Sequence, residues 1–171
     1  MDNLRKELKA EVISQDVLID GLVDQFVLAL TSKSRKYQST IITGYTGVGK
    51  SYVLELIVEK FFRSKDRVLK IDMTAYKDAA SARNALFGAM NGYVSAAENK
   101  GIFCEFLDGA GRNGGVIILN ELEEAPGEVQ SLMMEMLDTG EVRGGDGRVR
   151  RLNRHFFAGT SNKVAERILT P

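Results

Sequence analysis

The chain has 171 residues, of which 44% are hydrophobic and 27% charged, which is typical of a soluble protein that buries one core. Its 23 Lys and Arg balance 23 Asp and Glu, so net charge gives no argument for binding to nucleic acid or a membrane. One cysteine excludes an intrachain disulfide, and no signal peptide or membrane-spanning apolar run is visible, so we expect a cytoplasmic protein.

The predicted elements alternate between helices and strands. Apolar residues at helical spacing predict a first helix ending near Val12 and a second helix with apolar positions from Leu18 to Leu30. A hairpin is predicted between Gly140 and Leu152. Strands are predicted at 39–43, 67–72, 116–119 and 155–160, and further helices at 53–62, 79–87, 102–107, 126–137 and 163–169. This alternation predicts an α/β fold with a parallel sheet.

The stretch from Gly44 to Ser51 fits the phosphate-binding pattern Gly-x-x-x-x-Gly-Lys-Ser/Thr, between a predicted strand and a predicted helix. The glycines let successive backbone N–H groups point inward around phosphate oxygens, and the helix start adds partial positive charge. Lys50 is expected to contact the outer phosphates, and Ser51 to hold Mg²⁺. The nucleotide-binding positions are therefore predicted to be Gly44, Tyr45, Thr46, Gly47, Val48, Gly49, Lys50 and Ser51. The motif predicts binding of ATP with Mg²⁺.

The apolar run 116–119 is followed by Asn120 and Glu121, where nucleotide hydrolases with this loop usually carry two acids. Glu121 stands where the second acid polarises the attacking water. Asn120 stands at the metal side, where its amide can accept a hydrogen bond from a Mg²⁺-bound water but lacks the negative charge that a hard cation prefers. We therefore predict weakened Mg²⁺ affinity and slowed hydrolysis.

These motifs, in this order and spacing, resemble the large subdomain of an AAA+ ATPase, closest to the Clp-type protein unfoldases. The matching segments are 12–16, 44–51, 92–94, 116–125, 137–140, 146–148 and 160–162. The resemblance implies a three-layer P-loop NTPase fold in which residues 1–171 form a single large subdomain. Ser14 in place of the usual Gly is a minor departure from the family pattern, and Asn120 in place of Asp is a serious one.

The resemblance also assigns roles to individual residues. It implies that Val12 and Ile13 line the adenine pocket and that Asn162 is a polar sensor that positions the attacking water or contacts the terminal phosphate. The bottom-up alternative for Asn162 is a polar helix cap. Tyr93, in Gly92-Tyr93-Val94, matches the pore loop that grips a threaded polypeptide, although residues 95–100 depart from the family's continuation. The alternative for Tyr93 is packing in a turn.

The family's ring architecture sets further expectations. Members assemble with copies of themselves, usually as hexamers, and act on polypeptide substrates. A further strand, an arginine finger and a small helical subdomain follow the sensor segment in these proteins, and the sequence ends before them. We therefore expect a piece of a longer protein whose phosphate-loop strand lies at a sheet edge.

Two other functions stay open. A nucleotide-gated binding or scaffold module without turnover is favoured by Asn120, and torsin-like AAA+ proteins are a related case. A different client is suggested by residues 125–131, which are similar to MoxR-type ATPases, and by Leu86-Phe87-Gly88, which is similar to the enhancer-binding transcription activators. The Gly-Ala-Phe-Thr-Gly-Ala loop of those activators is absent here.

The segment 143–155 is rich in arginine, with Arg143, Arg148, Arg150, Arg151 and Arg154 followed by His155. A solvated hairpin is favoured over a nucleic-acid surface, because the overall charge is neutral and no aromatic stacking platform is interleaved. The lone histidine supports neither a zinc site nor a nucleophilic triad.

Overall fold

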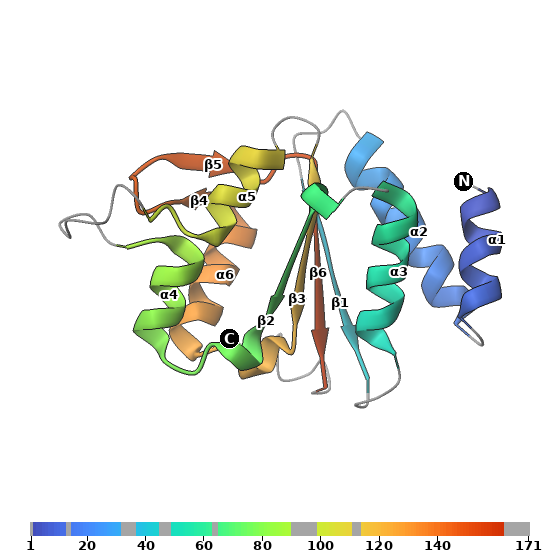
Figure 1. Cartoon of the computed structure of the whole chain (residues 1–171), viewed down its shortest axis with the longest axis horizontal. Helices are drawn as coiled ribbons and strands as arrows, with labels where there is room; N and C mark the ends of the chain where they lie inside the picture. Colours follow the sequence, from blue (N-terminus) through green and yellow to red (C-terminus); the bar gives the residue numbers. More distant parts are fainter. Residues whose placement is uncertain are drawn as a thin grey trace.

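The computed structural model describes residues 2–12, 15–31, 37–44, 49–62, 65–89, 99–110 and 114–162. Its centre is a sheet of four strands in the order β1-β6-β3-β2 (Figure 1). The strands are β1 (Gln38–Thr43), β6 (His155–Ser161), β3 (Gly115–Asn120) and β2 (Val68–Asp72), and every pairing is parallel. The predicted α/β fold with a parallel sheet is confirmed.

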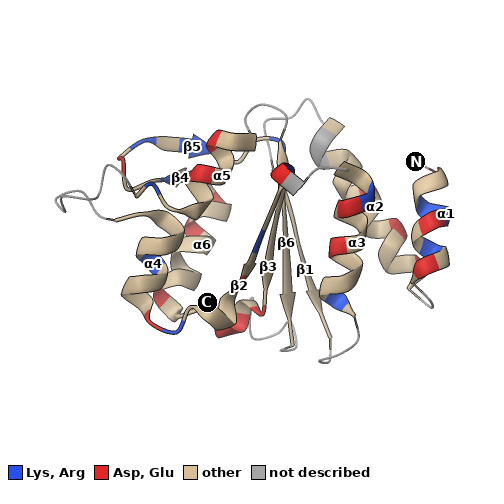
Figure 2. Ribbon diagram, in the orientation of Figure 1, with Lys and Arg blue, Asp and Glu red and all other residues tan. Residues whose placement is uncertain are grey.

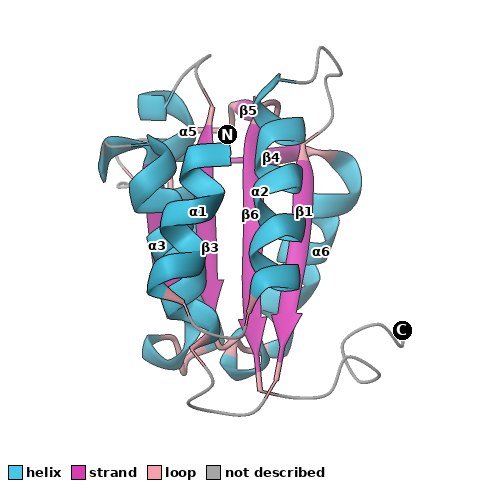
Figure 3. Ribbon diagram, turned by 90° about the vertical axis from the view of Figure 1, so that its right-hand side faces the viewer, coloured by secondary structure: helices cyan, strands magenta, loops and turns pink. Residues whose placement is uncertain are grey.

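Helices cover both faces of this sheet (Figures 1 and 3). One face carries α1 (Asp2–Glu11), α2 (Asp16–Thr31) and α3 (Lys50–Phe62). The other carries α4 (Ala79–Phe87), α5 (Ile102–Ala110), α6 (Gly127–Thr139) and the hairpin of β4 (Glu141–Arg143) and β5 (Val149–Arg151). Short 3₁₀ turns, η1 (Lys65–Arg67), η2 (Met73–Ala75) and η4 (Leu122–Glu124), adjoin β2 and β3. None of the described helices is both long and apolar enough to cross a membrane.

The core is divided by the sheet into two apolar clusters, because alternate residues of each strand point to opposite faces. Val116 and Ile118 of β3 pack on the α3 side, and Ile117 and Leu119 pack on the α6 side. All four are buried, which explains the continuous apolar run in the sequence. On the α3 side, the rings of Phe26 and Phe156 stack with their centroids 4.1 Å apart.

The phosphate-loop strand β1 lies at an edge of the described sheet, as the sequence predicts. It pairs with β6 from Gln38↔Phe156 to Thr43↔Ser161, and Ile41 is 42% exposed. Such an edge presents backbone groups to which another strand can add.

Several predicted boundaries differ from the structure, among them those of α6, β2 and α5. The sequence predicts Pro126 as the first residue of α6, but it is the N-cap: its backbone is extended (φ −56°, ψ 144°) and its carbonyl accepts the first helical hydrogen bond from Gln130 N. Arg67 belongs to η1 rather than β2. Helix α5 continues through Gly109 to Ala110, since no local signal before that point stops it. The predicted helix 163–169 lies outside the described residues.

Removing one buried methyl group from α3 should weaken the fold measurably. Ile57 is fully buried, so Ile57→Val is expected to lower the free energy of unfolding by about 1 kcal/mol. The same substitution at the exposed edge residue, Ile41→Val, is the matched control and should lower the free energy of unfolding far less. Urea unfolding of both variants checks this, and equal losses would contradict the described position of α3.

Candidate nucleotide site

The predicted catalytic and metal-binding residues gather where the parallel strands end, at one edge of the sheet. Gly44 follows β1, Asn120 ends β3, and Asn162 follows β6. Helix α3 begins at the same edge with Lys50 and runs back along the sheet (Figure 1). In open α/β sheets, ligands bind in the crevice at this edge.

Lys50 is held inside the site by oxygen atoms. Its side chain is largely buried, and its Nζ donates to Gly44 O at 2.8 Å and to Asn162 Oδ1 at 2.9 Å. Gly49, just before it, has φ +83°, which glycine adopts readily and a side chain would strain. The ammonium group therefore lies between the end of β1 and the end of β6, with oxygen neighbours that phosphate oxygens can replace.

Ser51 and Asn120 form the second part of the site. Ser51 Oγ donates to Asn120 Oδ1 at 3.0 Å, and Thr160 Oγ1 donates to the same oxygen at 3.3 Å. Thr160 Oγ1 in turn accepts from the backbone N–H of Glu121 at 3.3 Å. The amide oxygen of Asn120 is thus fixed beside the serine hydroxyl by two donors.

The oxygen atoms beside Ser51 are of the kind that Mg²⁺ binds, but they carry no negative charge. Mg²⁺ takes oxygen ligands and usually binds through carboxylates, waters and substrate phosphates. Ser51 and Asn120 offer oxygens 3.0 Å apart, and both are neutral. Across the described ranges, no group of three or more His, Cys, Asp or Glu side chains could hold a metal by itself. A metal here would need phosphate oxygens as ligands.

Glu121 and Asn162 are in direct contact. Glu121 has left-handed backbone angles, φ 54° and ψ 53°, which are rare for a residue with a side chain and common at functional sites. Asn162 Nδ2 donates to Glu121 Oε2, and the backbone N–H of Asn162 donates to Glu123 Oε1 at 2.6 Å. Asn162 therefore connects the Lys50 ammonium group to the Glu121 carboxylate.

The structure brings together Lys50, Ser51, Asn120, Glu121 and Asn162, with Gly44 and Gly49 beside them. Val12 is buried in the core cluster on the α3 side, and its N–H donates to Leu8 O at 2.9 Å. Ile13, residues 45–48 and Tyr93 lie outside the described residues. The catalytic, adenine-binding and pore-loop roles of all these residues stay predictions.

Sequence reasoning missed Thr160, Glu123 and Asp72 at the same edge. Thr160 orients Asn120, and Glu123 accepts from Asn162. Asp72 ends β2 and is the parallel-ladder partner of Asn120. The sequence shows an aspartate at the end of a predicted strand, but only the sheet order shows that this strand, β2, lies next to β3.

The arginine-rich hairpin is held against α5 by ion pairs. Arg150, with 10% of its side chain exposed, pairs with Asp146 at 2.6 Å and with Asp108 of α5 at 2.8 Å. Hydrogen bonds from Arg150 lower the pKa of both carboxyl groups. Burial raises the pKa of the nearby Cys104 thiol to about 11, so this thiol is protonated at neutral pH. These contacts favour the structural explanation of Arg150 over a nucleic-acid surface.

Charges of both signs are interspersed along the helices on the two sides of the sheet (Figure 2). In the hairpin, Arg151 pairs with Glu141 at 3.1 Å, and Arg143 donates to Gly147 O at 3.0 Å. This distribution gives no support to a one-sign binding surface. The expectation that the chain does not bind nucleic acid stays a prediction.

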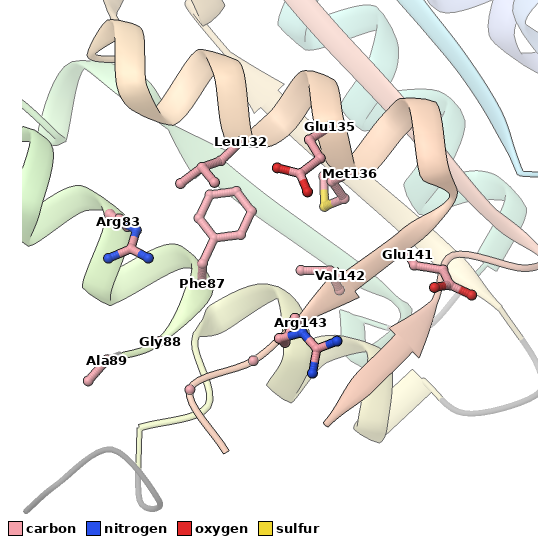
Figure 4. A pocket seen from close by; sticks show the side chains of 12 residues that line it. Arg83, Phe87, Gly88, Ala89, Leu132, Glu135, Met136, Glu141, Val142 and Arg143 are labelled. Carbon is pink, nitrogen blue, oxygen red and sulfur yellow. The ribbon is translucent and has the colours of Figure 1, made fainter. Parts of the chain in front are cut away.

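A hollow of about 320 Å³ lies elsewhere, between α4, α6 and β4 (Figure 4). Its walls include the apolar side chains of Phe87, Leu132 and Met136, and Arg83 and Arg143 stand at its margin. None of the predicted nucleotide-binding residues lines it. The hollow is therefore not evidence for or against the nucleotide site.

Comparison with known proteins relates most of the chain to one family. Residues 18–170 match the family described as the Sigma-54 interaction domain. The chain is also similar to "Chaperone protein ClpB" of Lactiplantibacillus plantarum, 28% identical over 98% of this chain and 19% of that protein. "Chaperone protein ClpB 2" of Synechocystis sp. is 30% identical over 98% of this chain and 19% of its own length.

A third relative, "ATP-dependent Clp protease ATP-binding subunit ClpL" of Staphylococcus aureus, is 26% identical over 95% of this chain and 23% of its own length. The chain therefore spans about a fifth of the length of these relatives. The resemblance to Clp-type AAA+ proteins predicted from the motifs is confirmed.

Proposed function

Because this chain belongs to the Sigma-54 interaction domain family of AAA+ domains, we propose that it is the ATP-binding module of a Clp-like ATPase that remodels or unfolds protein substrates. The observation that carries the proposal is the set of contacts from Lys50 through Asn162 to Glu121, with Ser51 and Asn120 beside it. Residues far apart in the sequence form these contacts at the sheet edge where nucleotides bind in α/β folds.

Each side chain has a role that its position supports. Lys50, with its ammonium group among oxygens, would bind and neutralise the outer phosphates. Asn162 would contact the terminal phosphate or position water, since its amide already lies between Lys50 and Glu121. Glu121 would accept the proton of the attacking water or orient it. Bound Mg²⁺, held by Ser51 and through water by Asn120, would supply positive charge to the phosphates.

In the same proposal, hydrolysis by this chain alone is slow. Asn120 brings no negative charge to the metal, and no neighbouring subunit supplies an arginine finger to the isolated chain. The working form would then be a ring of this protein or homologous subunits, as a hexamer, with polypeptide as the substrate. The open edge of β1 is compatible with additional chain or a partner beside it.

A binding assay combined with a phosphate-release assay tests the proposal. We expect the chain to bind a fluorescent ATP analogue and to release phosphate slowly. A chain that binds no ATP, with or without Mg²⁺, would contradict the proposal.

The second candidate is a nucleotide-gated scaffold without turnover. Asn120 favours it, because a neutral amide at the metal side of the site brings no negative charge to Mg²⁺. Retained ATP affinity with no phosphate release, even in the full-length ring, would select this candidate over the ATPase.

The client is a separate question. The matched family's description names sigma-54, and a sigma factor or a MoxR-like client is therefore an alternative to an unfolded polypeptide. The sequence after Gly92 is Tyr-Val-Ser-Ala, without the Gly-Ala-Phe-Thr-Gly-Ala loop of the enhancer-binding activators. We therefore favour the polypeptide client.

Tyr93 tests that choice. In the assembled full-length ring, Tyr93→Ala is expected to reduce polypeptide translocation about tenfold while leaving ATP binding unchanged, because an aromatic anchor of this kind contributes over 1 kcal/mol. Tyr52→Ala, at an exposed tyrosine of α3, is the control. Normal translocation by Tyr93→Ala would exclude the pore-loop role.

A further inference from the structure

The sheet places a carboxylate directly beside Asn120. Asp72, the last residue of β2, is the Cα partner of Asn120 in the parallel ladder, and such strands lie about 4.8 Å apart. Along β2, Val68 packs on the α3 side and Leu69 on the α6 side. By this alternation Asp72 belongs to the α3 side, where the Asn120 oxygen accepts from Ser51.

An ion pair between β2 and α3 shows which residues face each other there. Lys70 Nζ lies 2.7 Å from Glu55 Oε2 of α3. Asp72 is about 6.6 Å further along the strand, and Ser51 is one turn, about 6 Å, nearer the helix start. Helix α3 and strand β2 run in opposite directions (Figure 1), so by this spacing Asp72 stands at the level of Ser51, as Lys70 stands at the level of Glu55.

The side chains of Asp72 and Ser51 are shorter than those of Lys70 and Glu55. Lys70 crosses the gap to Glu55 with its four-carbon stem. Asp72 has a short side chain, so the corresponding gap can accommodate water. A carboxylate separated from a Ser–Asn oxygen pair by water has the arrangement of an outer ligand to a hydrated cation.

One oxygen of the Asp72 carboxylate is held by hydrogen bonds, and the other can accept further ones. Its Oδ1 accepts from Thr74 N at 3.0 Å and from Thr74 Oγ1 at 2.7 Å. Within the described part of the chain, Oδ2 accepts no hydrogen bond from the protein. Thr74 therefore fixes the direction of the carboxylate while Oδ2 stays accessible to water.

We propose that Asp72 supplies the negative charge that Asn120 lacks, by accepting hydrogen bonds from the water shell of nucleotide-bound Mg²⁺. The inference rests on the proposed nucleotide binding and adds a positioning residue to that site. Asp72 would thus bring to the site the negative charge that Ser51 and Asn120, both neutral, do not provide.

The test is a Mg²⁺ titration of the full 171-residue chain bound to an ATP analogue with a ribose-linked fluorophore. For Asp72→Asn we expect the Mg²⁺ concentration at half-maximal response to rise at least about tenfold, as for other outer-shell partners. Binding of the analogue without Mg²⁺ should not weaken, because the substitution removes a carboxylate whose negative charge repels the phosphates. Asp78→Asn is the matched control: Asp78 caps α4 through Ser81 N, and asparagine also caps helices.

A double variant separates charge from local folding. In Asp72→Asn with Asn120→Asp, one carboxylate is moved to the neighbouring strand, and the Mg²⁺ response should return to the wild-type level or better. An unchanged Mg²⁺ response in Asp72→Asn, with Mg²⁺-free binding intact, would overturn this inference alone. Failure of the wild-type chain to bind the analogue under any condition would overturn the proposed function as well.

Discussion

Lys50→Ala is expected to weaken ATP binding by about 10- to 150-fold. The ammonium group is buried beside Gly44 O and Asn162 Oδ1, so a phosphate would meet it with little competition from water. A hydrogen bond to a charged group contributes about 1.5–3 kcal/mol, which corresponds to that range of dissociation constants. Isothermal titration calorimetry of ATP into the wild type and into Lys50→Ala measures the difference in affinity.

Lys60→Ala is the matched control on the same helix. Lys60 pairs with Glu11 at 2.5 Å near the end of α3, far along the helix from the site. Its loss should leave ATP affinity unchanged. If Lys50→Ala bound ATP as tightly as the wild type, the phosphate-binding role of this edge of the sheet would be wrong.

Asn120→Asp is expected to raise ATP turnover by about 10- to 100-fold. An aspartate is close in shape and can still accept from Ser51 Oγ and Thr160 Oγ1, so the local geometry should persist. The substitution adds the negative charge that Mg²⁺ prefers, and changes of this kind alter metal affinity or activity by about that factor. Phosphate release at saturating ATP measures it.

The control for this variant is Asn153→Asp, which makes the same chemical change in the turn before β6. That turn lies at the opposite end of the strand from Asn162. ATP turnover of Asn153→Asp should equal that of the wild type. Unchanged turnover in Asn120→Asp would show that Asn120 does not limit the reaction.

The fold was predictable because its signals are local and agree with one another. The apolar run from Val116 to Leu119 is buried on both faces of the sheet, and helix α4 has the predicted bounds, with Asp78 as its cap. The edge position of β1 followed from the family resemblance. The N-cap position of Pro126 was not predicted, because proline is suited to several positions at a helix start.

The site was predictable as a set of residues but not as a network. The phosphate-loop pattern identified Lys50 and Ser51, and the end of an apolar strand identified Asn120 and Glu121. The contact of Asn162 with Glu121 joins the ends of two strands that only the sheet order places side by side, and a glutamate does not signal the left-handed backbone found at position 121. Asp72 needed the sheet order, since only the pairing of β2 with β3 places it beside Asn120.

A crystal structure of the chain with Mg²⁺ and a non-hydrolysable ATP analogue would test the proposed nucleotide site most directly. We expect the terminal phosphate to lie against Lys50 Nζ, in place of Asn162 Oδ1, with Mg²⁺ beside Ser51. A nucleotide bound elsewhere, such as in the hollow between α4, α6 and β4, would contradict it.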